Sequence, residues 1–373
     1  MSKKVLFTSH RANFAKFNRP FMRWFKEQGY EVHYASDGKE EVLDCDKHFD
    51  VCFDRSPYSK NNIKAYRQLK DIIDKENYDI IHCHTPMGSV VTRLAAKDAR
   101  KKGTRVLYTA HGFHFYKGAP LVNWLFYYPV EKYLSKYTDC IITINQEDFE
   151  RAKAKFKSTN VEKINGVGVD LNRFKPVSGE EKVSLREQYG FNEDDFILIY
   201  VAEFTENKNH RFILGCLEQL KNMIPNLKVI FAGDGATSEE MAEMSNKLGL
   251  GNIVNFLGYR KDINNLLNVS DIVVSASVRE GLPINVIEGM ASGLPIVCAD
   301  IRGQVDVVNN DVNGYLYETN NKKQFENAII DLYGDENKRI KIGQQNLIDV
   351  EKFSLERAIK NMSNIYQRYK GSL

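Results

Sequence analysis

The chain has 373 residues, of which 43% are hydrophobic and 27% charged, a composition typical of a soluble globular protein with two or three domains. Its 24 glycines and 9 prolines are too few for a mainly disordered chain, and no apolar run approaches the roughly 18 residues of a transmembrane helix. The net charge of +3 is unevenly divided, because residues 1–177 carry 31 basic and 21 acidic side chains, whereas residues 178–373 carry 21 and 28.

The cysteines and the N-terminus indicate a cytoplasmic protein. The six cysteines lie without paired spacing, most of them inside apolar runs, which is typical of reduced thiols. The two lysines near the N-terminus precede only about five apolar residues, too few for the core of a signal peptide. The basic first half favours an anionic partner, which is either nucleic acid or an anionic membrane surface or lipid substrate.

Short apolar strands alternate with amphipathic helices in the first half of the chain. The predicted strands cover residues 4–9, 31–35, 78–84, 104–110 and 139–145. The predicted helices cover residues 18–29, 63–75, 88–102, 122–135 and 146–156. Uninterrupted Val, Ile and Leu strands that alternate with helices favour a parallel sheet covered on both faces.

The same alternation restarts after residues 176–182 (PVSGEEK), which we predict to be a linker because the charge balance changes sign there. Further strands are expected over 196–202, 228–233, 253–257, 271–276 and 295–299. The sequence therefore predicts two tandem Rossmann-like, doubly wound α/β domains that face each other across a ligand-binding cleft. Their expected ranges are 1–177 and 178–352, with a C-terminal helix over 353–373 that packs back on the first.

The most informative stretch is residues 275–303, SASVREGLPINVIEGMASGLPIVCADIRG. Gly281 and Leu282 are expected to place backbone N–H groups at the start of a helix, where a phosphate can bind. Glu280 and Glu288 would be poor phosphate ligands but good acceptors for sugar hydroxyls. This arrangement indicates a nucleotide sugar, with its diphosphate at the helix start and one carboxylate for each sugar.

Glu280 and Glu288 lie within EGLPINVIEGMASGLPIV and are separated by seven residues. This element resembles the E-x7-E motif of retaining glycosyltransferases of family 4, the capsule and exopolysaccharide branch, which have the GT-B fold. The resemblance covers essentially the whole chain. It implies that Glu280 faces the donor sugar and that Glu288 binds the ribose hydroxyls. The alternative is a loop glutamate followed by an unrelated glutamate on a helix surface.

A second motif, YVAEFTENKNH over residues 200–210, contains Lys208. An ammonium beside a diphosphate leaving group offsets the charge that develops as the bond to the sugar breaks. The family has a Gly-Arg pair earlier in this loop, but Ala202 and Glu203 occupy that place here, which removes one expected cation. Arg211 is a candidate replacement, and the alternative for Lys208 is a solvated lysine at a helix N-terminus.

A third motif, YTAHGFHFY over residues 108–116, contains His111. By resemblance, His111 points toward the donor sugar and phosphate. A neutral histidine there would donate to a sugar hydroxyl, and a cationic one would assist the leaving group; a capping or packing role is the alternative. After the first strand, His10 and Arg11 are candidates for binding a phosphate, although the family's Gly-Gly pair is missing there.

Three further residues are expected to bind the donor. Gly233 follows a strand and allows close approach of a base or ribose. Arg260 lies where the resemblance places the base loop and could stack on the base, although an exposed loop arginine is an equal alternative. Arg302 is a candidate contact to the donor sugar. Two patterns of metal-ligating residue types, DCD at 44–46 and HCH at 82–84, are interpreted as a loop and as packing residues.

The sequence thus predicts a hexosyltransferase that uses a nucleotide diphosphate sugar, most simply a UDP-sugar, and a lipid-linked saccharide acceptor in cell-surface polysaccharide synthesis. The resemblance implies a retaining enzyme, and we expect no metal or other cofactor because the helix start and Lys208 supply positive charge. Residues 119–128 (APLVNWLFYY) are either a core-facing helix or a contact with the anionic inner face of the cell membrane. A nucleotide-sugar epimerase and a non-catalytic sugar-binding protein are the alternatives, and nucleic acid is not expected, because basic and acidic residues are interspersed.

Overall fold

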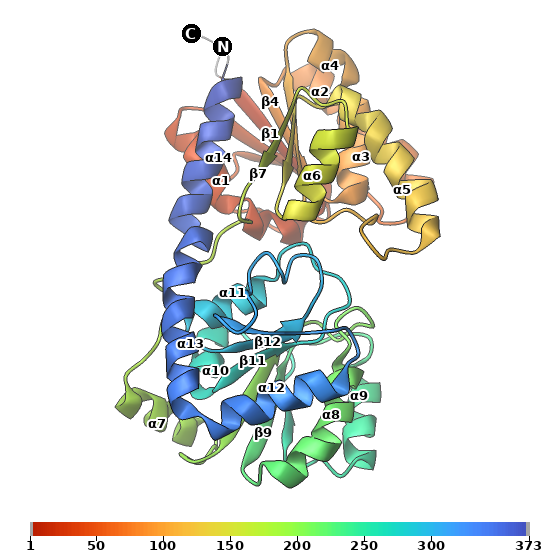
Figure 1. Cartoon of the computed structure of the whole chain (residues 1–373). Coiled ribbons are helices and arrows are strands. Elements are labelled where there is room, and N and C mark those ends of the chain that lie inside the picture. The colour runs from red at the N-terminus through yellow and green to blue at the C-terminus, as the bar shows by residue number, and fades with distance from the viewer. Residues whose placement is uncertain (1–2, 371–373) are drawn as a thin grey trace. The chain divides into compact units, whose positions relative to one another are not determined.

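The computed structural model describes residues 3–370 and divides the chain into two compact units (Figure 1). The first unit runs to Gly168 and includes the C-terminal segment from Glu356, and the second runs from Val169 to Leu355. The predicted linker at 176–182 therefore lies inside the second unit. Its composition has another cause: Ser178 caps helix α7 (Gly179–Gln188) by accepting a hydrogen bond from the Glu181 backbone, and acidic residues fill the first turn.

Over the described residues, the first unit contains a seven-stranded parallel sheet in the order β3-β2-β1-β4-β5-β6-β7. The strand order reverses between β1 and β4, as in doubly wound folds. The strands are β1 (Lys4–Arg11), β2 (Glu31–Asp37), β3 (Lys47–Asp50), β4 (Ile80–His84), β5 (Arg105–Ala110), β6 (Cys140–Thr143) and β7 (Asn160–Lys163). The helices are α1 (Arg19–Glu27), α2 (Asn61–Glu76), α3 (Pro86–Ala95), α4 (Lys97–Lys101), α5 (Leu121–Leu134), α6 (Gln146–Lys155) and α14 (Leu355–Tyr369).

Neighbouring residues of β1 face different helices, because side chains alternate across a strand. Leu6 packs in a buried cluster with residues of α2 and α3. Phe7, the next residue, contacts Phe25 of α1, which in turn contacts Tyr366 of α14. Helices therefore cover both faces of this sheet, which confirms the predicted doubly wound architecture.

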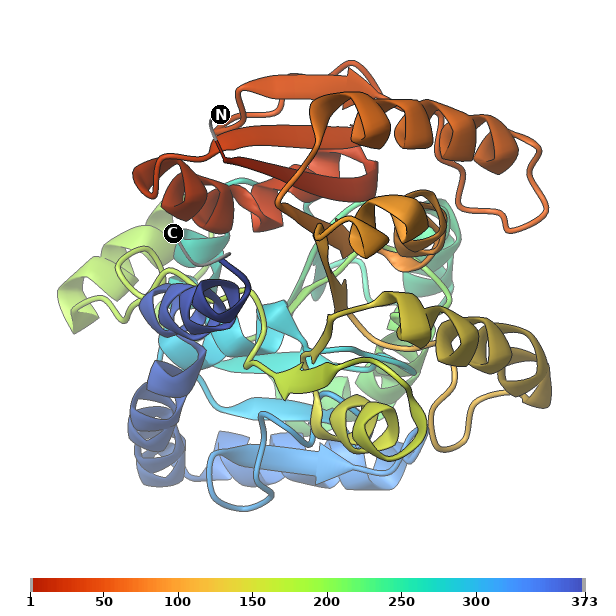
Figure 2. The same cartoon turned by 90° about the horizontal axis from the view of Figure 1, so that it is seen from above.

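The C-terminal helix belongs to the first unit and lies beside α1 (Figures 1 and 2). Tyr366 is fully buried, stacks on Trp24 and donates or accepts a 2.8 Å hydrogen bond with His82. The helix begins at Leu355 rather than at residue 353, because Val350–Phe353 forms a 3₁₀ turn; residues 371–373 of the predicted range lie outside the described residues.

Within the described residues, the second unit contains a six-stranded parallel sheet in the order β10-β9-β8-β11-β12-β13. Its strands are β8 (Phe196–Val201), β9 (Leu227–Ala232), β10 (Val254–Phe256), β11 (Ile272–Ser275), β12 (Ile296–Ala299) and β13 (Gly314–Tyr317). Besides α7, its helices are α8 (His210–Met223), α9 (Ser238–Lys247), α10 (Ile263–Val269), α11 (Ile284–Ala291), α12 (Lys322–Gly334) and α13 (Glu336–Asp349).

Alternate residues of β8 belong to two separate buried clusters. Leu198 and Tyr200 pack with residues of α8, α9 and α12. Ile197 and Ile199 pack with residues of α10 and α11 on the other face. This double burial explains why the strand reads as an uninterrupted apolar run.

The sequence missed β3, β7 and β13, and it merged α3 and α4 into one helix. The three missed strands are four residues long and lie at sheet edges, where their side chains are largely half-buried or exposed. They therefore lack the apolar run that identified the central strands. Among the described residues, no helix combines the length and the hydrophobicity needed to span a bilayer.

Candidate functional site

The loops that follow β8 and β11 meet where the strand order of the second sheet reverses. β8 and β11 are parallel neighbours, with Ile199 opposite Val273, and ligands of such sheets bind beyond the carboxyl ends of the strands at the reversal. There the ammonium of Lys208 forms an ion pair with the carboxylate of Glu280. Two residues that were predicted from separate motifs, 72 positions apart, are thus in direct contact.

The pair is held by hydrogen bonds that the sequence did not predict. The side-chain amide of Asn207 donates to the carbonyl of Arg279 at 3.0 Å and ties the two loops together. The hydroxyl of Tyr200, at the end of β8, donates to the carbonyl of Lys208 at 2.9 Å and lies 3.0 Å from the hydroxyl of Ser277. Because Tyr200 and Ser277 are fully buried, these contacts fix the backbone on both sides of the ion pair.

Helix α11 begins directly after the Glu280 loop and confirms the helix that the sequence places there. Its N-cap residue is Pro283, and no side chain caps the helix. The N–H groups of a first helical turn have no partner inside the helix, and the helix dipole adds partial positive charge. Gly289 lets the helix lie directly on the sheet, because a Cβ there would be 2.4 Å from Cγ2 of Val273. Glu288 is partly buried, one turn inside the helix.

The other predicted residues of this loop region also lie near Glu280. Arg302, which follows β12, donates from Nε to the backbone carbonyl of Glu280 at 3.1 Å. Gly281 and Leu282 connect Glu280 to α11, and Leu282 packs against the buried cluster under that helix. The loops after β8, β11 and β12 therefore form one contiguous group of polar residues.

Gly233 and Arg260, the two residues predicted to lie near the nucleoside, have different surroundings. Gly233 follows β9 and approaches the loop after β8 so closely that a Cβ would lie 2.0 Å from the carbonyl oxygen of Ala202. Its N–H donates to the carbonyl of Gly258 at 2.8 Å. The guanidinium of Arg260, by contrast, is held by the carboxylate of Asp262 through two hydrogen bonds of 2.8 and 2.5 Å. An aromatic base would therefore meet an arginine that is already oriented by a neighbour.

Arg211 does not approach Glu280 in the described contacts. It forms an ion pair with Glu240 of α9, and both side chains are 52% exposed. Lys208 is therefore the cation that the second unit places against the predicted catalytic carboxylate, and the departure from the family at Glu203 is not offset by Arg211.

His111 lies in the first unit, just after β5. Its Nε2 is 3.1 Å from Nδ1 of His84, the last residue of β4, and its ring packs edge-on against Phe14 at 5.0 Å. Burial lowers the pKa of His111 to about 4, so the imidazole is neutral at pH 7. Of the two predicted roles, this favours hydrogen bonding by a neutral ring.

Three other residues that the sequence singled out in this unit contact neighbours. His10 accepts a hydrogen bond from Nε of Arg55 at 3.0 Å, and burial, with Arg55 nearby, lowers the pKa of His10 to about 4. Asp44 of the DCD pattern pairs with Arg19 at 2.6 Å. His82 contacts the hydroxyls of Tyr366 and Thr109, each at 2.8 Å, in agreement with a packing role.

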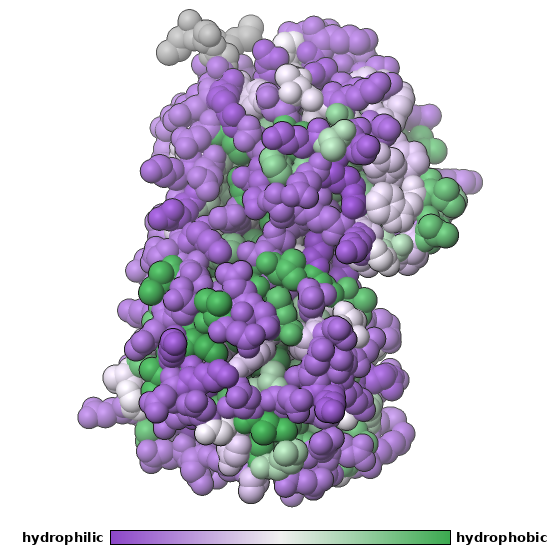
Figure 3. Space-filling view, in the orientation of Figure 1, coloured by the Kyte–Doolittle hydropathy of each residue, from purple (hydrophilic) through white to green (hydrophobic). Residues whose placement is uncertain are grey.

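Helix α5 presents an apolar face to solvent. Figure 3 shows hydrophobic side chains gathered at the edge of the first unit where α5 lies in Figure 1. Lys132 and Lys136 flank this face and lie over the rings of Tyr128 and Tyr133. We call it the α5 patch, and its exposed apolar residues are Leu121, Val122, Leu125, Phe126, Val130 and Tyr133.

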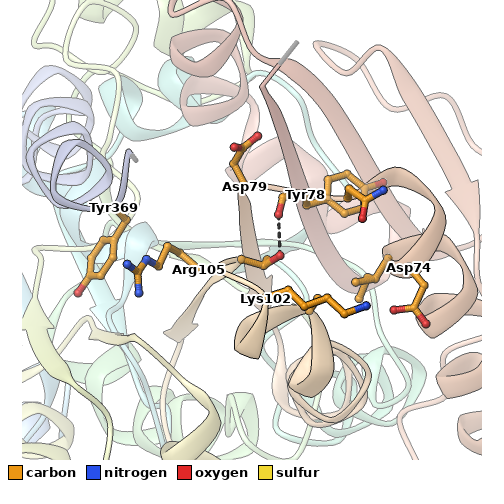
Figure 4. A pocket seen from close by; sticks show the side chains of 11 residues that line it. Asp74, Tyr78, Asp79, Lys102, Arg105 and Tyr369 are labelled. Carbon is orange, nitrogen blue, oxygen red and sulfur yellow. Dashed lines mark hydrogen bonds between the residues drawn. The ribbon is translucent and has the colours of Figure 1, made fainter. Parts of the chain in front are cut away.

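A cavity of about 350 Å³ lies in the first unit at the amino ends of the central strands β4 and β5 (Figure 4). Asp79, Lys102, Arg105 and Tyr369 line it, and Thr104 donates to the carbonyl of Tyr78 at 2.7 Å in its wall. None of the predicted site residues lines this cavity, so we do not assign it to the candidate site.

The positioning residues Asn207, Tyr200 and Ser277 lie within the stretches 200–210 and 275–303, but the sequence assigned them no role. They matter because β8 and β11 are adjacent, and adjacency of strands that are far apart in sequence is a property of the topology. The available signal in the sequence was that polar residues follow the two predicted strands at their carboxyl ends.

Chemically, the arrangement in the second unit combines donors for an anion with acceptors for hydroxyls. The first turn of α11 and the Lys208 ammonium attract negative charge. The carboxylates of Glu280, before the helix, and Glu288, one turn inside it, are hydrogen-bond acceptors.

Comparison with known proteins identifies the family. The family model described as glycosyl transferases group 1 matches residues 181–347, and the model described as glycosyl transferase 4-like matches residues 4–145. EpsD of Bacillus subtilis, which is named as a glycosyltransferase, is 45% identical over 371 residues, covering 99% of this chain and 97% of EpsD. The chain belongs to this glycosyltransferase family.

More distant relatives of this glycosyltransferase include proteins named for defined substrates. UDP-Gal:alpha-D-GlcNAc-diphosphoundecaprenol alpha-1,3-galactosyltransferase of Escherichia coli is 28% identical over 313 residues, covering 82% of this chain and 79% of that enzyme. The crystal structure of Anabaena HepE in complex with UDP and glucose matches with a TM-score of 0.81 and 20% identity, covering 98% of this chain and all of HepE. WaaG, a glycosyltransferase involved in lipopolysaccharide biosynthesis, matches with a TM-score of 0.78 and 13% identity, covering 99% of this chain and all of WaaG. The fold class is GT-B, as the resemblance implied.

Proposed function

We propose that this glycosyltransferase transfers a hexosyl group from a UDP-sugar to a hydroxyl of a lipid-linked saccharide in the synthesis of a cell-surface polysaccharide. The observation that carries the proposal is the contact between Lys208 and Glu280 in front of α11. The substrates printed in the name of the Escherichia coli relative, and the UDP and glucose held by HepE, support the donor and the acceptor class.

In this proposal the donor diphosphate binds the first turn of α11 and Lys208. Glu280 accepts from hydroxyls of the donor sugar, and Glu288 accepts from those of the ribose. Arg302 supports the Glu280 loop and contacts the sugar. Gly233 leaves room for the base or ribose, and Arg260, oriented by Asp262, offers its guanidinium plane to the base.

We further propose that the sugar keeps its anomeric configuration. The bond from the anomeric carbon to the phosphate oxygen breaks, and the acceptor oxygen forms its bond to that carbon on the same face. The acceptor proton passes to the departing phosphate oxygen, and UDP leaves. Lys208 and the helix N-terminus stabilise the negative charge of the leaving group, so the mechanism requires no metal ion.

The α5 patch would hold the enzyme on the anionic inner surface of the cell membrane, where a lipid-linked acceptor resides. Leu121, Leu125 and Phe126 are 80%, 72% and 57% exposed, and burying a side chain of this kind contributes about 1.5–3 kcal/mol. Lys117, Lys132 and Lys136 near this face complement anionic headgroups. The combination of apolar side chains with flanking lysines is typical of interfacial helices.

Vesicle sedimentation tests the membrane contact. The full chain should bind phosphatidylglycerol vesicles at low salt, and both high salt and pure phosphatidylcholine should weaken binding. The double variant Leu125→Asp, Phe126→Asp should bind at least about tenfold more weakly. Ile348→Asp is the control, because Ile348 is similarly exposed, at 68%, but lies in the second unit. Equal binding of the two variants would refute the contact.

Turnover tests the proposed reaction. The UDP-sugar that is the donor should raise the melting temperature of the chain, because ligands that bind the folded state stabilise it. Glu280→Gln should lower turnover of that donor by about 100-fold or more without lowering the melting temperature of the free enzyme by more than a few degrees. Glu206→Gln, in an exposed position of the loop after β8, is the control. Near-normal turnover of Glu280→Gln would contradict the proposed site.

A further inference from the structure

His84 and His111 form a pair at the carboxyl edge of the first sheet. β4 and β5 are parallel neighbours, with His84 opposite Thr109. His111 follows Thr109 by two residues and therefore lies beside His84. Nδ1 of His84 and Nε2 of His111 are 3.1 Å apart. One of these two nitrogens must carry a proton and the other must accept it, because two lone pairs or two N–H groups would repel each other.

The surroundings of His84 restrict its other nitrogen. The side chain is 1% exposed, and Nε2 makes no hydrogen bond within the described residues. The ring of Phe7 lies nearly parallel to that of His84, with an interplanar angle of 7° and the centroids 6.2 Å apart. The ring of His82 is tilted by 45° against it, with the centroids 4.2 Å apart.

Both rings are neutral near pH 7. Burial lowers the pKa of His84 well below its usual value, with smaller contributions from His82 and His111, and burial lowers the pKa of His111 to about 4. Each ring therefore carries one proton, either on Nδ1 or on Nε2. The pair has two arrangements, which differ in the direction of the hydrogen bond between the rings.

If His111 donates from Nε2, the proton of His84 must sit on its own Nε2, where it is a buried donor with no acceptor. If His84 donates from Nδ1, its Nε2 is a bare lone pair, and His111 carries its proton on Nδ1. Buried N–H groups without an acceptor are rarer in proteins than acceptors that lack a full set of donors. The second arrangement is therefore favoured.

We infer that His84 is a positioning residue that fixes His111 as an Nδ1–H tautomer and so directs a hydrogen-bond donor from His111 to the substrate. This inference rests on the proposed function only in naming the substrate group, a sugar hydroxyl or a phosphate oxygen. His82 imposes no such restriction on its neighbours, since both of its nitrogens face hydroxyl groups that can donate or accept.

Nitrogen NMR of the histidine rings tests the tautomer without any substrate. In the substrate-free full chain labelled with ¹⁵N-histidine, two-bond proton–nitrogen correlations should show the proton of His111 on Nδ1 at pH 7, whereas an unconstrained histidine favours Nε2. His84→Phe should move the His111 proton to Nε2, because it fills the same space without a donor. His33→Asn, which alters another buried histidine of this sheet, should leave His111 unchanged. A proton on Nε2 of His111 in the unsubstituted chain would overturn the inference.

Kinetics then separates positioning from packing. The donor is first found by measuring UDP release from UDP-glucose, UDP-galactose and UDP-N-acetylglucosamine. With that donor, His84→Phe should lower kcat about tenfold with little change in KM. This is the effect of losing one oriented hydrogen bond that strengthens in the transition state. A changed tautomer with unchanged kcat would refute the functional role of His84. Absence of UDP release from all three donors in the unsubstituted chain would refute these sugars as donors and leave the tautomer result intact.

Discussion

Replacing Gly289 by alanine tests whether close packing of α11 on the sheet positions the proposed donor site. The added Cβ would lie 2.4 Å from Cγ2 of Val273 and 3.3 Å from Cδ1 of Ile296. Because carbon atoms in contact need about 3.5–4.0 Å, the helix must move away from β11 by about 1 Å. Val273 is buried and β-branched, so its methyl group has little freedom to turn aside.

The expected loss of stability follows from two opposing effects. Overpacking of a core costs about 1–3 kcal/mol, whereas alanine in place of a helical glycine contributes up to about 1 kcal/mol. We expect the second unit to lose about 1–2 kcal/mol, which lowers the Tm of a unit of this size by roughly 2–8 °C. Since a 1 Å displacement of catalytic groups can reduce rates about 100-fold, kcat should fall more steeply than stability.

Calorimetry of the full chain and UDP release provide the two measurements. Val273→Ala in the Gly289→Ala background removes the methyl group that clashes, so the two substitutions together should destabilise the unit by less than the sum of their separate effects. Gly334→Ala is the matched control, because nothing lies within 4 Å of its added Cβ, and it should not lower Tm. An unchanged Tm and kcat in Gly289→Ala, or strict additivity with Val273→Ala, would refute the reasoning.

Three further predictions concern single side chains. Lys208→Met should lower kcat by about 100-fold because it removes the cation beside the leaving group, whereas Arg211→Met should leave kcat nearly unchanged; a large effect of Arg211→Met would show that it supplies the missing cation. The first unit should lose stability as pH falls from 6.5 toward 4, because His111 takes up a proton at a higher pH in the unfolded state than in the folded state. The free energy of unfolding should fall by up to about 1.4 kcal/mol per pH unit. Urea unfolding across this range should be less pH-dependent in His111→Asn. Tyr366→Ala should destabilise the first unit by about 3–5 kcal/mol, since it empties a fully buried site and breaks the hydrogen bond to His82; a loss below about 1 kcal/mol in urea unfolding would mean that α14 contributes little.

The strands that the sequence predicts best are those buried on both faces. β8 reads as FILIYV because each face of the strand meets a different layer of helices. The edge strands β3 and β7 read as KHFD and NVEK, which nothing separates from loops, whereas β13 reads as GYLY, whose apolar and aromatic run is only three residues long. Their strand conformation comes from hydrogen bonding to the neighbouring strand, which is a long-range effect.

The linker predicted at residues 176–182 was wrong because its residue types also fit a helix start. Serine, glycine and acidic residues in PVSGEEK suit a flexible connection, but Ser178 followed by Glu180 and Glu181 is also the pattern of a capped helix start. The unit boundary between Gly168 and Val169 lies in the segment INGVGVD, whose Asn-Gly pair and second glycine suit a turn. It follows from which residues share a core, and the sequence shows that only after the sheets are known.

The ion pair between Lys208 and Glu280 shows where sequence reasoning about the site ends. Each residue was selected from its own loop: Lys208 as a cation for the diphosphate leaving group, and Glu280 as an acceptor for sugar hydroxyls. Their contact depends on β8 and β11 being neighbours, and that neighbourhood arises because the chain reverses its strand order there. Asn207 and Tyr200 then hold the loops in register through backbone carbonyls, so neither needs a recognisable motif. A search for supporting residues in related chains should therefore cover the polar positions at the ends of the two strands that flank the reversal, such as Tyr200, as well as polar neighbours of the motif residues, such as Asn207.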